Sequence, residues 1–214
     1  MNSFIKWKYE KQLESKVKLL NSLGYECHGV TTAEEARAKV LELIPKEAEI
    51  GFGGSLTMNE LGVVQALRDG GYNILDRFKA ANHQEDLVLR KKALTCDYFL
   101  SGVNAITKKG ELCFVDAQGN RPAAVLFGPG NVIIAASLNK FVKDLAEAEE
   151  RCYSIAPINA NRNNHKDLPC GETGDCPGQC YRRDCMCNSF TVIRHCLKNP
   201  GRIKIVLVAD ELGL

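Results

Sequence analysis

The densest group of reactive side chains is a run of six cysteines between Cys170 and Cys196, out of ten cysteines in the chain. Glycines and prolines lie among them, so the backbone of this stretch can turn repeatedly. Thiolates spaced a few residues apart on a loop can bind one metal ion or one iron–sulfur cluster. The sequence therefore predicts a cysteine-rich ligand loop over residues 165–196.

Three kinds of chemistry remain open for these thiols. A [4Fe–4S] cluster would serve electron transfer or structure. A zinc ion would be structural, although its usual signal, paired C-x-x-C knuckles, is missing from this stretch. A redox-active or merely reduced group of thiols would need no metal. The spacing also leaves open whether Cys185 or Cys196 replaces another cysteine as a ligand.

A glycine-rich turn forms the second candidate site. The predicted strand AEIGF runs into Gly53, Gly54 and Ser55, after which Thr57 and Glu60 open a helix. Backbone amides at such a turn, beside the positive end of a helix, attract a carboxylate or a phosphate. The Ser55 and Thr57 hydroxyls could add hydrogen bonds. Alternatively, the glycines only permit tight packing, and Thr57 and Glu60 form a local capping box.

A polar turn between two predicted strands is the third candidate, with Asp116, Gly119, Asn120 and Arg121. Arg121 could bind a carboxylate through two guanidinium nitrogens, and Asp116 could accept a proton or orient a hydroxyl. Asn104 offers a similar polar contact beside another strand end. Ordinary turn chemistry also explains Asp, Gly and Asn here. We expect both turns to converge on one cleft that binds a small carboxylate or a phosphorylated metabolite.

The elements that position these residues alternate between helices and strands. Apolar spacing predicts helices over residues 5–23, over residues 83–94, and from Leu138 to about residue 150. A further helix is predicted to begin at a capping box formed by Thr32 and Glu35. Short apolar runs predict strands, among them YNIL, DYFLSG, VNAIT, ELCFVD, PAAVLF and NVIIAA. This alternation predicts a three-layer α/β domain with a mixed sheet.

The predicted organisation is one domain over residues 1–214, with an N-terminal helical part over 1–47 and a core over 48–150. After the cysteine loop, RIKIVLV at residues 202–208 has the apolar continuity of an interior strand. The chain is therefore expected to return to the sheet, which anchors the loop at both ends.

Composition excludes several classes of function. The 28 Lys and Arg residues nearly balance the 26 Asp and Glu residues and form no basic block, so nucleic acid is not an expected partner. There is no apolar run of membrane-spanning length and no secretory signal, which predicts a cytoplasmic protein. A reducing cytosol disfavours disulfides. The absence of a GxGxxG fingerprint disfavours a nicotinamide cofactor.

Four ordered motifs make the chain similar to a known family. IGFGGSLTMNELG, DYFLSGVNAIT, GELCFVDAQGNRPAAVLFGPGNVI and GRIKIVLVADELG resemble the LUD-domain family of bacterial lactate-utilization proteins. The resemblance implies a fold similar to the group of CoA-transferases and ribose-phosphate isomerases, in which ligands lie where glycine-rich strand-to-helix turns meet.

Some members of the family carry a similar cysteine-containing tail. The matching positions here are Cys170, Cys176, Cys180 and Cys187, which the resemblance implies as ligands of a [4Fe–4S] cluster, with zinc as the alternative. Three residues instead of two separate Cys176 from Cys180, and Cys185 is additional.

The resemblance implies a component of oxidative utilization of lactate or a related 2-hydroxy acid. An iron–sulfur partner subunit is expected, and self-association is left open. Whether the chain itself catalyses also stays open. One alternative is a stand-alone isomerase or acyl-CoA transferase-like enzyme that uses Glu60 or Asp116 and has a structural metal loop. Another is a noncatalytic metabolite sensor or scaffold.

Overall fold

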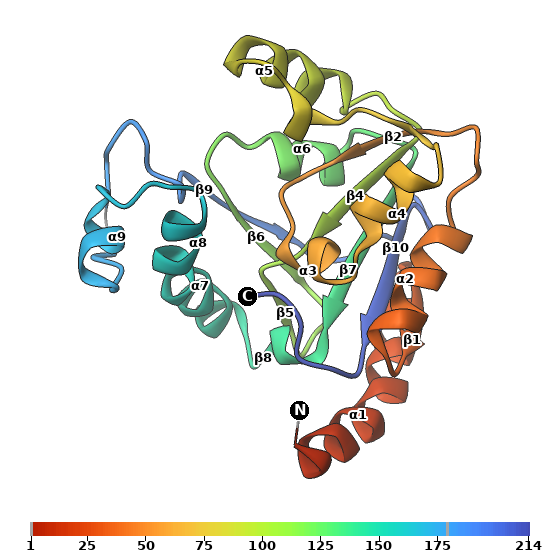
Figure 1. Ribbon diagram of the computed structural model, residues 1–214. Coiled ribbons are helices and arrows are strands. Elements are labelled where there is room, and N and C mark those ends of the chain that lie inside the picture. The colour runs from red at the N-terminus through yellow and green to blue at the C-terminus, as the bar shows by residue number, and fades with distance from the viewer. Residues whose placement is uncertain (1, 179) are drawn as a thin grey trace.

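A six-stranded parallel sheet forms the centre of the computed structural model, which describes residues 2–178 and 180–214 (Figure 1). The strand order is β1-β10-β7-β4-β2-β3, and every neighbouring pair runs parallel. Its strands are β1 (Glu26–Val30), β2 (Glu49–Phe52), β3 (Asn73–Ile74), β4 (Tyr98–Gly102), β7 (Asn131–Ser137) and β10 (Ile203–Val208). The expected return of the chain to the sheet is confirmed, because β10 lies between β1 and β7.

A second, smaller sheet has four strands in the order β8-β5-β6-β9. The β5–β6 and β6–β9 pairs are antiparallel, whereas β5 and β8 are parallel. Its strands are β5 (Ala105–Thr107), β6 (Leu112–Asp116), β8 (Phe141–Val142) and β9 (Ser189–Ile193). The predicted α/β class is confirmed, and the antiparallel strands gather in this separate sheet.

Helices connect the strands. The longer ones are α1 (Ser3–Ser22), α2 (Ala33–Glu42), α5 (His83–Lys92) and α7 (Leu145–Ser154). The shorter ones are α3 (Leu56–Glu60), α4 (Val63–Asp69), α6 (Asn120–Leu126), α8 (Ala156–Arg162) and α9 (Pro169–Thr173), with 3-10 turns η1 (Arg77–Lys79) and η2 (Leu138–Lys140). None of the helices within the described residues is long and apolar enough to cross a membrane.

Alternate residues of β7 face two different apolar layers, as the two-residue period of a strand requires. Ile133 and Ala135 pack with the buried side chains of α2, α3 and α4. Val132 and Ile134 face the opposite way, toward α6 and the apolar side chains of the second sheet. The large sheet is thus buried on both faces, which is why its strands read as continuous apolar runs.

The N-terminal helices form where the sequence predicts them. Helix α1 lies against β1, and a Cβ atom at Gly29 would come within 2.9 Å of Leu13 Cγ and Val17 Cγ2. A side chain at this position of β1 would therefore push the helix away. Thr32 caps α2 in a capping box with Glu35, as predicted.

Two predicted elements are wrong. The helix expected from Leu138 begins only at Leu145, where the Asp144 side chain accepts a hydrogen bond from the Glu147 amide. The residues before it form η2 and the edge strand β8. Their helix-like apolar spacing comes from packing against different neighbours. Leu138 lies in the main core, whereas Val142 belongs to the second sheet and packs with Ala105, Cys113 and Ala148.

PAAVLF, expected as a strand, is instead most of helix α6. Pro122 lies in the first turn of this helix, where its missing N–H costs nothing. The turn from Asp116 to Arg121 therefore joins a strand to a helix instead of joining two strands. Sequence analysis also missed β9, because its five residues lie within the stretch that was expected to be the cysteine-rich loop.

The parallel arrangement decides where the polar loops meet. Because β2, β4, β7 and β10 all run in one direction, their carboxyl ends lie at the same edge of the large sheet. Open α/β sheets bind ligands outside this edge. The glycine turn follows β2 there, and Asn104 follows β4.

Candidate functional site

A cavity of about 370 Å³ lies at this edge of the large sheet. Both turns singled out from the sequence contribute to its wall, together with the loop after β4. The predicted residues that line it are Gly54, Ser55, Thr57, Asn104, Asp116, Asn120 and Arg121. The structure thus brings together seven of the nine residues that were expected to form the cleft; Gly53 and Glu60 are not among the lining residues.

The two glycines of the first turn have different surroundings. A Cβ atom at Gly53 would lie 3.0 Å from Cγ and Cδ of Arg121, so this glycine makes room for the arginine side chain. A Cβ atom at Gly54 would meet nothing within 4 Å. Gly54 is therefore the glycine whose backbone a ligand could approach directly.

Ser55 is the residue that caps the short helix α3. Its Oγ accepts a hydrogen bond from the Met58 amide at 3.2 Å, and its side chain is buried. The predicted capping box of Thr57 and Glu60 is therefore wrong, because the helix begins two residues earlier than that box requires. Thr57 is instead buried in the cavity wall.

Glu60 is exposed, and its carboxylate accepts a hydrogen bond from the Gly213 amide at 2.6 Å. This contact ties the C-terminal segment to α3. Ser137 holds the same segment through hydrogen bonds with the backbone N–H and carbonyl of Leu212. The position of Glu60 thus gives it a structural partner, and its catalytic role stays a prediction.

Arg121 is engaged by several groups of the protein. Its guanidinium donates to the Asn104 Oδ1 atom at 2.8 Å, to the Val115 carbonyl at 2.7 Å and to Asp116 Oδ2 at 3.2 Å. These bonds connect the loop after β4 to the end of β6. Arg121 therefore holds the cavity wall together, and its charge acts on the cavity from a fixed position.

Asp116 organises the second turn in addition to pairing with Arg121. Its Oδ1 atom accepts hydrogen bonds from the amides of Gln118 and Gly119, at 3.1 and 2.7 Å. Gly119 has a φ of 77°, in the left-handed region that glycine adopts without strain. The carboxylate thus fixes the turn that presents Asn120 to the cavity.

Lys140, which sequence analysis missed, is a buried cation in the cavity wall with only 4% of its surface exposed. Its Nζ atom donates to Thr57 Oγ1 at 3.0 Å and to the Val103 carbonyl at 3.1 Å. Burial, followed by the charges of Arg151 and Arg121, lowers the pKa of this amine to about 7. No local sequence signal marks it, because a lysine after a strand usually points to solvent.

Basic side chains outnumber acidic ones around the cavity. Among the described lining residues, the cations are Arg77, Arg90, Arg121, Lys140, Arg162 and Arg183, and the carboxylates are Asp116 and Asp184. Asp86, behind the wall, pairs with Arg77 and Arg90 at 2.9 and 2.6 Å and offsets part of this excess. The remaining positive charge favours an anionic ligand.

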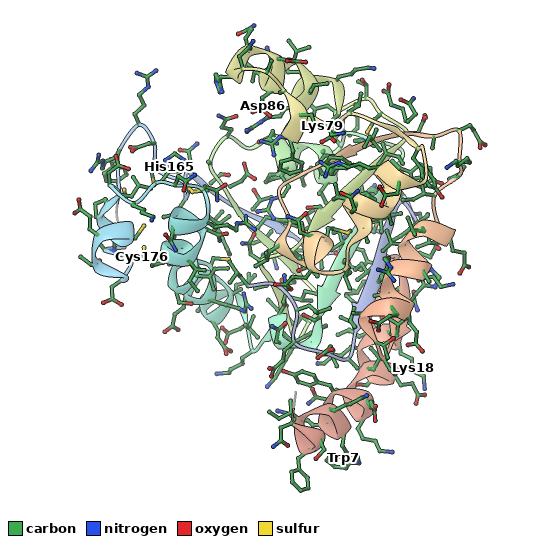
Figure 2. All side chains as sticks on the ribbon, in the orientation of Figure 1. Trp7, Lys18, Lys79, Asp86, His165 and Cys176 are labelled. Carbon is green, nitrogen blue, oxygen red and sulfur yellow. The ribbon has the colours of Figure 1, made fainter. Side chains whose placement is uncertain are left out.

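Five cysteines line a second cavity of about 480 Å³, on the side of the molecule where Figure 2 labels Cys176. They are Cys170, Cys176, Cys180, Cys185 and Cys187. Cys185 and Cys187 also line the first cavity, so the two cavities adjoin through this short stretch of chain. All four cysteines predicted as metal ligands are among the five.

Two neighbouring thiols of this group, Cys185 and Cys187, favour their neutral form. Burial, followed by the neighbouring thiols Cys185, Cys176 and Cys170, raises the pKa of Cys187 to about 12. Burial also raises the pKa of Cys185, as does a hydrogen bond with Cys180. Several thiolates cannot share this space without a cation between them. The donor set therefore fits a positively charged metal centre.

The sulfur atoms of the described cysteines are not gathered as closely as a bound zinc ion would hold them. A tetrahedral zinc ion with bonds of about 2.3 Å would hold its sulfur atoms about 3.8 Å apart. Within the part of the chain that the structure describes, no three cysteine sulfurs lie within 4.8 Å of one another. A cluster binds each thiolate to a different iron and so accepts a wider spacing.

The remaining cysteines lie elsewhere. Cys27, Cys96 and Cys113 are buried core residues, as the sequence indicates. Cys196 is also in the core, where its thiol donates to the Asn199 carbonyl at 3.1 Å. It lines neither cavity. Cys152 of α7 borders the first cavity, a position that its sequence context did not indicate.

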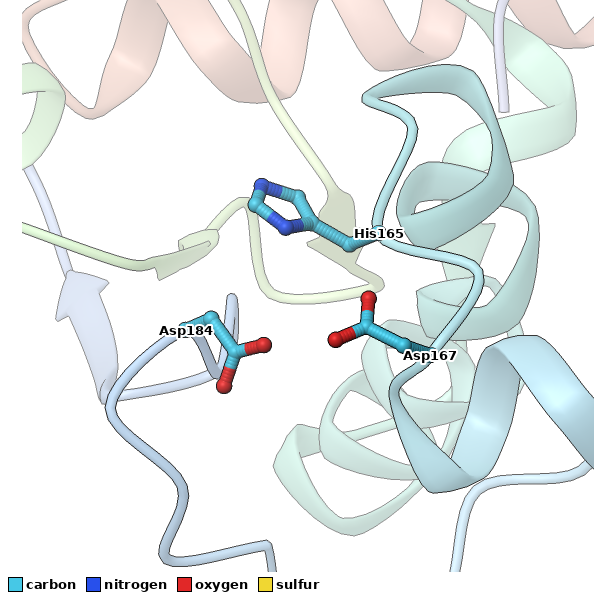
Figure 3. A group of neighbouring side chains, drawn as sticks. All are labelled: His165, Asp167 and Asp184. Atoms are coloured by element: carbon cyan, nitrogen blue, oxygen red, sulfur yellow. The ribbon is translucent and has the colours of Figure 1, made fainter.

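His165, Asp167 and Asp184 lie close together in the cysteine-rich segment, with the two carboxylates facing each other (Figure 3). Their candidate ligand atoms lie within 4.8 Å of one another. Arg182 ion-pairs with Asp167 at 3.7 Å and with Asp184 at 3.6 Å. The arginine thus already supplies a positive charge to both carboxylates, and the group needs no metal to be stable.

Comparison with solved structures shows three partial likenesses. A DUF162 family protein from Deinococcus radiodurans is 15% identical, with coverage of 95% of this chain and 97% of that one and a TM-score of 0.48. A D-ribose-5-phosphate isomerase in complex with phospho-erythronic acid is 15% identical over 54% of this chain and 55% of that one, with a TM-score of 0.36. The delta subunit of eIF2B from Chaetomium thermophilum is 14% identical over 65% and 54%, also with a TM-score of 0.36.

No curated protein matches this sequence. A family model described as the LUD domain matches residues 13–208, which include every strand of both sheets and the whole cysteine-rich segment. The chain therefore belongs to the LUD domain family, and this membership supports a role related to lactate utilization in general.

Proposed function

We propose that this protein binds a small carboxylate, lactate or a related 2-hydroxy acid, in the first cavity and holds an iron–sulfur cluster in the cysteine-rich segment. It would act as one component of an assembly that oxidises the acid. The observation that carries the proposal is the position of Cys185 and Cys187, which border both cavities. An anion-binding space and a group of thiols thus share a wall.

The charge and shape of the first cavity support a small anionic ligand. Six cations and two carboxylates line it, and the space of about 370 Å³ suits a small molecule. Gly54 leaves the backbone open to approach, while Asn104 and Asn120 offer amide groups. Arg121 would act chiefly through its charge, because its Nε and Nη2 hydrogens are bonded within the protein. Its Nη1 atom has only a 3.5 Å contact with the Gly102 carbonyl.

The second cavity supports the cluster. Cys170, Cys176, Cys180 and Cys187 would hold it, with Cys185 as a neighbouring fifth thiol. When bound, a [4Fe–4S] cluster supplies one-electron transfer. Oxidation of a 2-hydroxy acid to a 2-oxo acid releases two electrons, so a redox partner subunit must complete the reaction.

Iron content tests the cluster. Protein purified without oxygen should be brown and contain about four irons per chain. Cys176→Ser should lose the colour and most of the iron, whereas Cys196→Ser should keep both, because Cys196 lies in the core. Equal iron content in the two variants, or a colourless wild-type protein, contradicts this half of the proposal.

Calorimetric titration with lactate tests the carboxylate site. Arg162 lines the cavity, whereas Arg37 is exposed on α2 and does not. Arg162→Gln should weaken lactate binding about tenfold, since a charge-assisted contact contributes roughly 1.5 kcal/mol or more. Arg37→Gln should leave it unchanged. Equal affinities for both variants would exclude the cavity as the binding site.

A further inference from the structure

Lys140 is a buried amine without a paired carboxylate. No ion pair within 4.0 Å involves it in the described part of the chain. Its two hydrogen-bond partners, the Thr57 hydroxyl and the Val103 carbonyl, are both uncharged. A neutral amine has two hydrogens and one lone pair. It can therefore satisfy both partners with its hydrogens and keep its lone pair free, and the residue lines the first cavity.

The charges around Lys140 also favour the neutral amine. Arg151 of α7, Arg121 of α6 and Arg162 of α8 each act on it with a positive charge, and Glu60 of α3 is the acidic group that opposes them. With burial as the largest cause, these groups bring its pKa to about 7. A desolvated lysine beside other cations is a nucleophile at neutral pH.

We propose that Lys140 forms a reversible imine with the carbonyl group of a 2-oxo acid bound in the first cavity. This inference rests on the proposed function, because a 2-oxo acid is the oxidised form of the 2-hydroxy acid assigned to the same site. The amine would distinguish the two ligands, because the 2-oxo acid has a ketone carbonyl that can form an imine and the 2-hydroxy acid has only its carboxylate.

The reaction balances with water as its only other product. The lone pair of Nζ attacks the carbonyl carbon, and the carbonyl oxygen takes one amine proton to give a carbinolamine. The C–O bond then breaks, a C=N bond forms, and the second amine hydrogen leaves with the hydroxyl group as water. No oxidant or reductant takes part. Thr57, whose hydroxyl is 3.0 Å from Nζ, is placed to relay the proton.

Trapping with borohydride tests the imine. The full-length chain is incubated with pyruvate at neutral pH and reduced, and the labelled lysines are located by peptide mass mapping. Reduction should add the mass of pyruvic acid less one oxygen atom, on Lys140. At pH 7 about half of an amine with this pKa is neutral, roughly a thousandfold more than for an ordinary lysine. Label at Lys140 should therefore exceed label at other lysines by at least about tenfold.

Two variants provide the control. Lys140→Arg keeps a long basic side chain but cannot form an imine, and should lose the label. Lys143→Arg changes an exposed lysine three residues away and should leave it in place. If Lys140→Arg does not fold, the peptide mass map of the labelled wild-type protein still tests the proposal. Label distributed over exposed lysines overturns it.

Lactate separates this inference from the proposed function. Lactate binding without pyruvate label at Lys140 would overturn the imine and leave the carboxylate site standing. Absence of binding by both acids would overturn the carboxylate site and the imine together. Saturable binding of both acids, with label confined to Lys140, is the expected result.

Discussion

The cavity at the sheet edge and the cysteine-rich segment differ in how their side chains are held. In the cavity, Arg121, Asp116 and Lys140 all have hydrogen-bond partners within the protein. In the segment, the thiols are drawn together with few polar partners, and raised pKa values keep Cys185 and Cys187 neutral. The fold itself fixes the first site, whereas the second gathers ligands that a bound centre would complete.

Packing shows the same difference. The cavity rests on two large apolar clusters that cover both faces of the parallel sheet. The segment has one small cluster, in which Ala160, Leu168 and Cys170 are buried and Cys180 and Met186 pack against them. In Figure 1 this part of the chain, with α8 and α9, extends from the side of the molecule away from α1 and α2. This part of the chain should therefore unfold locally at a lower free energy than the core.

The largest effect should come from Arg121→Ala. Removal of the guanidinium takes one donor each from Asp116 Oδ2, from Asn104 Oδ1 and from the Val115 carbonyl. Loss of one partner of a buried ion pair costs about 3–5 kcal/mol, which should appear as a lower free energy of unfolding in urea. Exposed Arg37→Ala, the control, should change it by less than about 0.5 kcal/mol. A loss below about 1 kcal/mol for Arg121→Ala would contradict a cavity fixed by the fold.

Lys140→Met should change how stability depends on pH. In the folded protein the pKa of Lys140 is about 7, because burial and the charges of Arg151, Arg121 and Arg162 lower it more than Glu60 raises it. In the unfolded chain the same amine keeps its proton to about pH 10.4. The unfolded state thus binds more protons between these values, and stability should rise with pH across that window by roughly 2–4 kcal/mol.

The variant should lack this rise. The free energy of unfolding is measured from pH 6 to 10 for the wild type and the variant, and the difference between the two pH curves gives the contribution of Lys140. Other groups that titrate in this range are common to both proteins. Parallel curves would show that Lys140 is solvated like a surface lysine and would weaken the contrast between the two regions.

A pair of glycine variants tests the packing of the cavity wall more finely. Gly53→Ala places a methyl group 3.0 Å from the Arg121 side chain, and such overpacking should cost roughly 1–2 kcal/mol. Gly54→Ala meets nothing within 4 Å and should change stability by less than about 0.5 kcal/mol, while it obstructs the ligand. Urea unfolding and lactate titration measure the two effects. Equal stability losses in the two variants would contradict the different roles of the glycines.

The smallest effect on global stability should follow removal of iron with a chelator. The free energy of unfolding of the core should fall by less than about 1 kcal/mol, because the segment contributes little to the main clusters. Cleavage by trypsin after the exposed residues Arg182 and Arg183 should increase about tenfold. Cleavage after Lys18 in α1 serves as the internal reference. Cooperative loss of the whole fold on iron removal would show that the two regions are one unit.

Elements with local signals could be predicted from the amino-acid sequence. The capping box at Thr32 and Glu35, the apolar run of β10 and the glycines after β2 each encode their structure within a few residues. The clustered cysteines also indicated a ligand segment, because their close spacing is visible in the linear sequence. Four ordered motifs were enough to place the chain near its family, which the match over residues 13–208 then confirmed.

Which residues meet depends on long-range packing. The four-stranded sheet depends on β9 pairing with β6 across more than seventy residues of sequence, a contact that no local pattern records. Lys140 looks like an ordinary lysine after a strand until its burial and its distance to Thr57 are known. Arg121 looks like a free ligand clamp until its hydrogen bonds are traced. Local propensity sets the elements, but burial and charge environment arise from long-range packing, and these decide what a side chain can do.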